Sequence, residues 1–109
     1  MMRKIDTEEI TQNIREMCIE ANHFLSPDMK KALGAAEKNE NSPLGKKILG
    51  QLQENLKIAA EEMIPICQDT GMAVVLLEIG QEVTLMGDYL EDAVNEGVRQ
   101  GYDEGYLRK

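Results

Sequence analysis

Two Ser-Pro pairs divide the first part of the chain, and this punctuation constrains the fold more than any other feature. Proline ends a helix that precedes it and suits the first turn of a helix that follows, with the preceding serine as N-cap. The pairs stand at residues 26–27 and 42–43. They predict one helix before residue 26, a second from Pro27 to about residue 39, and a third from Pro43 to about residue 63.

Apolar residues recur every three or four positions in each of these helices, so they share one helical face. We expect the first helix to start at Asp6 or Thr7, with Asp6 and Glu9 as a capping box. The residues predicted to be buried are Ile10, Ile14, Met17, Ala21 and Leu25 in the first helix, Met29, Leu33 and Ala36 in the second, and Leu44, Ile48, Leu52, Leu56, Ala59 and Met63 in the third.

The pattern changes after Pro65. Residues 73–79 form a continuous apolar run that predicts a strand buried on both faces, residues 80–82 a tight turn, and residues 83–86 a short return strand. Gly87 and Asp88 then predict the cap of a fourth helix, with Glu91 in the capping-box position. The predicted buried face of this helix is Leu90, Ala93, Val94, Gly97 and Val98.

The predicted fold is therefore α+β and helix-rich, with three N-terminal helices, a β-hairpin and a C-terminal helix. One hairpin cannot bury both of its faces with so little additional chain. We expect residues 1–109 to be an incomplete part of a larger domain, whose sheet continues in further chain or is covered by another subunit.

Charge and cysteine content exclude several classes of protein. The formal net charge of -8 disfavours nucleic acid and anionic membrane surfaces, which are bound by clustered Lys and Arg. The two cysteines, Cys18 and Cys67, are too few and too far apart for a disulfide-stapled secreted domain. No apolar signal core or membrane-length stretch is present, so a reduced, cytoplasmic location is expected.

The segment at residues 65–71, Pro-Ile-Cys-Gln-Asp-Thr-Gly, concentrates functional side chains between the third helix and the predicted strand. Cys67 offers a thiolate, a soft ligand suited to iron–sulfur clusters, zinc or copper(I). Asp69 offers a carboxylate for proton transfer, and the Gln68 amide can hold a substrate carboxylate or hydroxyl. Thr70 and Gly71 suit a sharp turn that exposes these groups together.

This segment resembles the signature of the class I fumarate hydratase and tartrate dehydratase family, in the amino-terminal part of the alpha subunit or the equivalent region of fused enzymes. The resemblance continues in residues 43–49, 55–59, 71–81 and 97–102. It implies a hydro-lyase that reversibly hydrates fumarate to malate, or dehydrates tartrate. The sequence does not decide whether the substrate is fumarate or tartrate. It also leaves open whether the protein forms a homodimer and whether the beta part is fused to this chain or separate.

The resemblance also implies a [4Fe–4S] cluster held by three cysteines, of which one matches Cys67. The iron left open would act as a Lewis acid on the substrate hydroxyl. Asp69 would handle the proton of that hydroxyl, Gln68 would hydrogen-bond the substrate, and Arg108 would meet a substrate carboxylate with its planar fork. The base for the carbon-bound proton is expected in the other subunit or domain.

Cys67 alone matches the family's ligands, and Cys18 matches none. We therefore expect the remainder of the alpha chain and a beta subunit or domain as partners, and no cluster or turnover in the separate chain. The alternative is a non-catalytic fragment that only folds or binds a subunit. Asp69-Thr70-Gly71 is also the triplet of aspartic proteases, which have an almost all-strand fold. His23 is expected to be structural.

Overall fold

The computed structural model describes residues 2–109, which contain four helices and two short strands joined by loops. In chain order they are β1 (Arg3–Asp6), α1 (Thr7–His23), α2 (Pro27–Asn39), α3 (Pro43–Glu62), β2 (Val83–Met86) and α4 (Leu90–Glu104). No helix among these residues is both long and apolar enough to span a membrane.

The three N-terminal helices begin where the sequence predicts. The Asp6 carboxylate accepts a hydrogen bond from the backbone N–H of Glu8 at the start of α1, at 2.8 Å. Ser42 Oγ accepts from the N–H of Gly45 at the start of α3, at 3.3 Å. Pro27 and Pro43 each occupy the first helical position. These caps satisfy N–H groups that lack a partner within the helix, and the three-helix prediction is confirmed. The predicted Asp6–Glu9 capping box does not form among the described residues, because Asp6 accepts from Glu8 instead. Ser26 is the N-cap of α2 but makes no side-chain capping bond.

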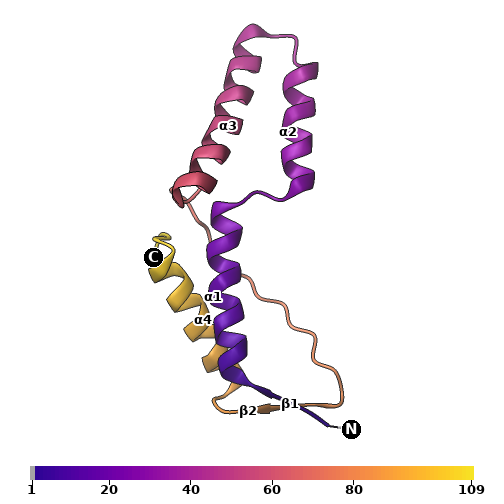
Figure 1. Ribbon diagram of the computed structural model, residues 1–109, viewed down its shortest axis with the longest axis vertical. Coiled ribbons are helices and arrows are strands. Elements are labelled where there is room, and N and C mark those ends of the chain that lie inside the picture. Colours follow the sequence, from indigo (N-terminus) through magenta and orange to yellow (C-terminus); the bar gives the residue numbers. More distant parts are fainter. Residues whose placement is uncertain (1) are drawn as a thin grey trace.

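The helices form two pairs that lie one beyond the other along the long axis of the molecule (Figure 1). One pair is α1 with α4, and the other is the hairpin of α2 with α3. The radius of gyration is 18.2 Å, whereas a compact domain of this length has about 13 Å. The accessible surface is 8392 Å², whereas a compact monomer of this mass exposes about 6,100 Å². The described chain therefore leaves surface uncovered that a compact domain would bury.

Small residues on α4 let it pack closely against α1. Ala93, Gly97 and Gly101 are buried at four-residue intervals along one face. An ideal Cβ placed on Gly97 would lie 2.7 Å from the Thr11 carbonyl oxygen. The Thr11 hydroxyl in turn donates a hydrogen bond to the carbonyl of Ala93 at 2.8 Å. The predicted burial of Ala93 and Gly97 is confirmed.

The predicted buried faces of α1 and α3 are only partly correct, and that of α2 is wrong, because no residue of α2 is buried. Ile14 and Ala59 are buried, but Met17 and Ala21 of α1 are exposed, and the buried polar residues Thr7 and Thr11 share its inner face. Close approach to α4 favours short side chains with satisfied hydrogen bonds over long apolar ones. On α3, Leu44, Ile48 and Leu52 are exposed because nothing within residues 2–109 covers them.

The predicted β-hairpin is wrong. Residues 83–86 do form a strand, but this strand, β2, pairs in parallel with β1, with Arg3 opposite Val83 and Asp6 opposite Met86. Residues 73–79 form no strand. They are fixed at one end, where the Tyr102 hydroxyl donates to the carbonyl of Gly71, and run out to β2 at the other. The run must span these two points and cannot fold back along β2 (Figure 1).

The predicted cap of the fourth helix is also wrong. α4 begins at Leu90 with Tyr89 as its N-cap, and Tyr89 makes no side-chain capping bond. Gly87 instead turns the chain with φ of 102°. It passes so near Thr7 that an ideal Cβ would lie 2.8 Å from the Thr7 hydroxyl. Residues 87–88 therefore serve the turn between β2 and α4.

Candidate functional site

The motif loop, residues 65–71, follows directly from the end of α3. Met63 closes this helix in the left-handed conformation, with φ of 52° and ψ of 50°. The N–H groups of Met63 and Ile64 both donate to the carbonyl of Ala59, the latter at 3.1 Å, which closes the last turn of the helix. The chain thus turns sharply before it reaches the motif.

Ile66, the residue before Cys67, is held from two sides. Its N–H donates to the carbonyl of Asn22 in α1 at 2.8 Å, and its own carbonyl accepts from the Asn55 side-chain amide of α3 at 2.8 Å. Both backbone polar groups of one residue are therefore fixed by different helices. This anchoring determines where the thiol of Cys67 can be presented.

The chemistry-bearing side chains of the loop are exposed and locally ordered. Cys67, Gln68 and Asp69 are all exposed. The N–H of Asp69 donates to Cys67 Sγ at 3.4 Å, and the N–H of Gly71 donates to Asp69 Oδ1 at 3.4 Å. The backbone N–H of Asp69 therefore helps to fix the position of the Cys67 sulfur. Gly71 has φ of 67°, which permits the turn that this arrangement requires.

The end of α4 anchors the other side of the loop. The Tyr102 hydroxyl donates to the carbonyl of Gly71 at 3.2 Å, and the N–H of Arg108 donates to Thr70 Oγ1 at 2.9 Å. Arg108 therefore lies beside the motif, although 38 positions separate it from Thr70. Of the four side chains expected in the site, Cys67, Gln68 and Asp69 share one loop, and Arg108 joins them through its backbone.

A left-handed turn after α4 places Arg108 at the loop. The N–H of Leu107 donates to the carbonyl of Tyr102 at 2.9 Å, and the N–H of Tyr106 donates to that of Asp103 at 3.4 Å. This pair of bonds is the Schellman arrangement, with Tyr106 at φ of 56° in the position that glycine usually holds. Leu107 is buried and fixes the turn.

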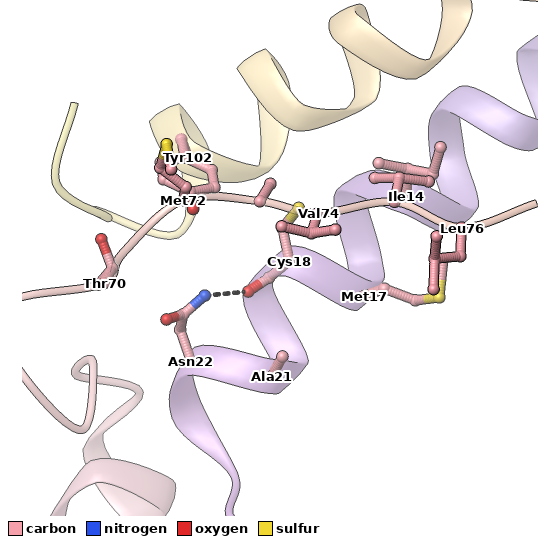
Figure 2. A pocket seen from close by; sticks show the side chains of 12 residues that line it. Ile14, Met17, Cys18, Ala21, Asn22, Thr70, Met72, Val74, Leu76 and Tyr102 are labelled. Atoms are coloured by element: carbon pink, nitrogen blue, oxygen red, sulfur yellow. Dashed lines mark hydrogen bonds between the residues drawn. The ribbon is translucent and has the colours of Figure 1, made fainter.

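An apolar groove of about 450 Å³ separates α1 from the chain that leaves the motif loop. Figure 2 shows Cys18 and Asn22 of α1 beside the extended chain that carries Thr70, Met72 and Val74. Burial raises the pKa of the Cys18 thiol above its usual value. This is the behaviour of a structural cysteine.

Residues 2–109 contain no cluster of three or more His, Cys, Asp or Glu side chains that could enclose a metal ion. The loop thus offers one soft ligand, Cys67, with one carboxylate two residues away. The chemistry of this donor set fits one ligand of an iron–sulfur cluster, and it leaves the other ligands to be supplied from elsewhere.

The structure adds site residues that the sequence did not indicate. Asn22, Asn55 and Tyr102 hold the loop, yet each lies in an ordinary helical pattern with no local signal of this role. Only the three-dimensional fold reveals them. His23, expected to be structural, is buried, and its Nδ1–H donates to the carbonyl of Ile19 at 2.6 Å. The aspartic-protease alternative is wrong, because the triplet lies in a loop of a helix-dominated fold.

Comparison with known proteins identifies relatives over nearly the whole chain. The family model described as fumarate hydratase (Fumerase) matches residues 11–109. A protein named putative L(+)-tartrate dehydratase subunit alpha, from Methanocaldococcus jannaschii, is 36% identical over 92% of this chain and 35% of its own length. The anaerobic class I fumarate hydratase of Escherichia coli is 34% identical over 96% of this chain and 19% of its own. The chain thus spans about a third or less of these relatives.

Proposed function

Because the chain belongs to the fumarate hydratase (Fumerase) family, we propose that it forms part of a hydro-lyase that reversibly hydrates fumarate to malate or dehydrates tartrate. One observation carries this proposal: the motif loop is held between α1, α3 and the end of α4 while its thiol and carboxylate stay exposed. A loop fixed at both ends presents functional groups in a defined geometry, which is what catalysis requires.

We propose Cys67 as one ligand of a [4Fe–4S] cluster in the complete enzyme. Its exposed thiol and the N–H of Asp69 directed at Sγ support this assignment. When bound, such a cluster supplies an open iron that acts as a Lewis acid on the substrate's hydroxyl and carboxylate oxygens. The remaining ligands would come from polypeptide outside these residues, so we expect the separate chain to be inactive.

Asp69 is proposed to handle the proton of the substrate hydroxyl. The N–H of Gly71 donates to Oδ1, which fixes the carboxylate and leaves Oδ2 without a hydrogen-bond partner among residues 2–109. The Gln68 side chain is exposed in the same loop, where its amide can hydrogen-bond the substrate. The two groups are adjacent in the chain, and both face solvent.

Arg108 is proposed to bind a substrate carboxylate. Its backbone is fixed to Thr70, and within the described residues its guanidinium makes no ion pair. An unpaired guanidinium can form two parallel hydrogen bonds with a carboxylate. In a four-carbon dicarboxylate substrate, one carboxylate would bind the Arg108 guanidinium while the hydroxyl group lies near Asp69.

The proposal includes partners: the remainder of an alpha chain and a beta subunit or domain. The name of the Methanocaldococcus jannaschii relative, subunit alpha, supports such an assembly, and so does its greater length. A cytoplasmic location is part of the same proposal. The alternative, a non-catalytic fragment that folds or binds a subunit, differs in one respect, because it predicts no cluster even when the rest of the polypeptide is supplied.

A chimera tests the proposal. Residues 1–109 would replace the matched region of the anaerobic Escherichia coli class I fumarate hydratase, and the purified protein would be reconstituted anaerobically with iron and sulfide. We expect a visible cluster absorption and hydration of fumarate. Asp69→Asn should lower kcat by about 100-fold or more with the cluster retained.

Paired cysteine variants supply the control. Cys67→Ser should abolish the cluster and the activity, while Cys18→Ser should keep both. A folded chimera that binds a full cluster equally well with Cys67→Ser would refute the assigned ligand. A folded chimera with no cluster at all would favour the non-catalytic alternative.

A further inference from the structure

Residues 72–79, which we call the apolar segment, expose more apolar side-chain surface than any other short stretch of the described chain. Met72 and Leu76 are each 91% exposed and Val74 is 81% exposed. Leu77 and Ile79 are about half exposed, at 48% each. Contiguous apolar surface of this kind marks an interaction site in a soluble protein.

The backbone of the apolar segment is unpaired as well. None of its N–H or C=O groups forms a hydrogen bond with the rest of residues 2–109. The segment runs extended across the open side of the molecule to β2 (Figure 1). It includes the strand formers Val74, Val75 and Ile79, carries one charge, at Glu78, and contains no proline. It therefore has the composition and conformation of a strand that lacks neighbours.

Hollows lie on both sides of the first half of the segment. On the α1 side is the groove of about 450 Å³ described above. On the α4 side is a second one of about 500 Å³, lined by Val94, Val98 and Tyr102 and, at the end near the motif loop, by Arg108 and Lys109. A single neighbouring strand would use one edge only. The open space on both sides indicates that the segment becomes an inner strand with cover on each side.

We propose that the apolar segment is a docking strand, and that its occupant is the polypeptide that completes this family's chain, which supplies an apolar β-strand along each edge. The chain spans 35% of one relative and 19% of another, so relatives have ample further polypeptide for this role. The docking strand rests on the proposed function in one respect: the further polypeptide is taken to be the rest of the hydro-lyase.

The uncovered surface favours this occupant over a second copy of the chain. The described residues expose about 2,300 Å² more than a compact monomer, whereas one side of a standard interface covers about 800 Å². Two copies that pair through one edge of the segment would also leave its second edge and the exposed face of α3 open. A larger polypeptide can cover all of these surfaces at once.

Hydrogen exchange tests the proposal, with the chimera described above compared with the separate chain. In the separate chain, we expect the amides of residues 73–79 to exchange at nearly the rate of an unfolded peptide. In the chimera, we expect the same amides to exchange at least about 100-fold more slowly, as paired strands do. This readout does not depend on iron or activity, so the hydro-lyase proposal can fail while the docking strand survives, and the reverse also holds.

Leu76→Lys, with Tyr89→Lys as the matched control, supplies the second measurement. Both side chains are more than 80% exposed in the described structure, but only Leu76 belongs to the docking strand. Leu76→Lys should leave the melting temperature of the separate chain unchanged and lower that of the chimera. Tyr89→Lys places a positive charge at the N-terminus of α4, so it should lower both melting temperatures slightly and by the same amount.

Several outcomes would overturn the docking strand. These are fast exchange of residues 73–79 in a folded chimera, equal effects of the two lysine variants on its melting, and a chimera that becomes soluble only with Leu76→Lys. Protection of the segment in the separate chain, with a dimer by sedimentation, would identify a second copy as the occupant instead.

Discussion

Replacing Gly97 by alanine should destabilise the contact between α1 and α4, although alanine is normally the better helix former. An added Cβ would lie 2.7 Å from the Thr11 carbonyl oxygen and 2.8 Å from Ile14 Cβ. Neither atom is the end of a flexible side chain, so the helices themselves must move apart. Ordinary contact begins at 3.4 Å, which implies a separation of about 0.7 Å at this point.

The magnitude follows from three contributions. Overpacking of this kind costs about 1–3 kcal/mol. The same movement stretches the buried bond from the Thr11 hydroxyl to the Ala93 carbonyl, now 2.8 Å, and losing it costs about 1 kcal/mol. Better helix propensity returns about 1 kcal/mol. We therefore expect a net loss of about 1–3 kcal/mol in the free energy of unfolding of the α1–α4 pair.

Gly34→Ala is the matched control, because it makes the same chemical change in α2. The nearest atom to an ideal Cβ there is Gln53 Oε1, at 3.8 Å, so there is room. This variant should gain about 0.5–1 kcal/mol from helix propensity. Native-state amide exchange is the suitable assay, because the two helix pairs can open independently. If amide exchange in α4 of Gly97→Ala is slower or unchanged while Gly34→Ala shows the expected stabilisation of α2, the close packing of α4 against α1 is refuted.

Three further predictions concern single side chains. Tyr106→Gly should stabilise the end of α4 by up to about 1 kcal/mol, measured by amide exchange, because it removes a side chain from a left-handed position. With an aromatic disulfide reagent at pH 8, exposed Cys67 should react at least about tenfold faster than Cys18, because burial raises the pKa of the Cys18 thiol. Equal reaction rates would contradict the different exposure of the two thiols in the structure. Hydrogen bonds from Arg99 lower the pKa of Glu96 from 4.5 to about 2. The stabilisation from this pair is therefore complete above pH 4.5 and lost as the pH falls toward 2. An NMR titration of the Glu96 carboxylate should have its midpoint near pH 2, and Arg99→Gln should raise that midpoint.

The parts of the fold that depend on neighbouring residues could be predicted from the sequence. The ends of α1, α2 and α3 follow from Asp6, Ser42 and the two prolines, because capping acts within a few residues. The motif loop could be singled out as a candidate site because Cys67, Gln68 and Asp69 are consecutive. Local signals carry enough information for both features.

The errors arise where distant residues decide the outcome. The hairpin prediction assumed that residues 73–79 would pair with their nearest neighbour in sequence, but β2 pairs with β1 from the far end of the chain. Periodicity also cannot identify Thr7 and Thr11 as core, because their burial depends on the glycines of α4 opposite them. The anchoring of the loop by Asn55 is likewise invisible before the helices are placed.

The parallel pairing of β1 with β2 has a consequence for the order in which the chain can fold during synthesis. Arg3 pairs with Val83, so the first strand must wait for 80 further residues, on the order of ten seconds of translation. The α2–α3 hairpin is complete long before then, while α1 has no α4 to pack against. We expect α1 to emerge from the ribosome as an unpartnered helix in which Thr7 and Thr11 are still hydrated. The α1–α4 pair, together with the fixed motif loop, should form only after α4 and Arg108 have been synthesised.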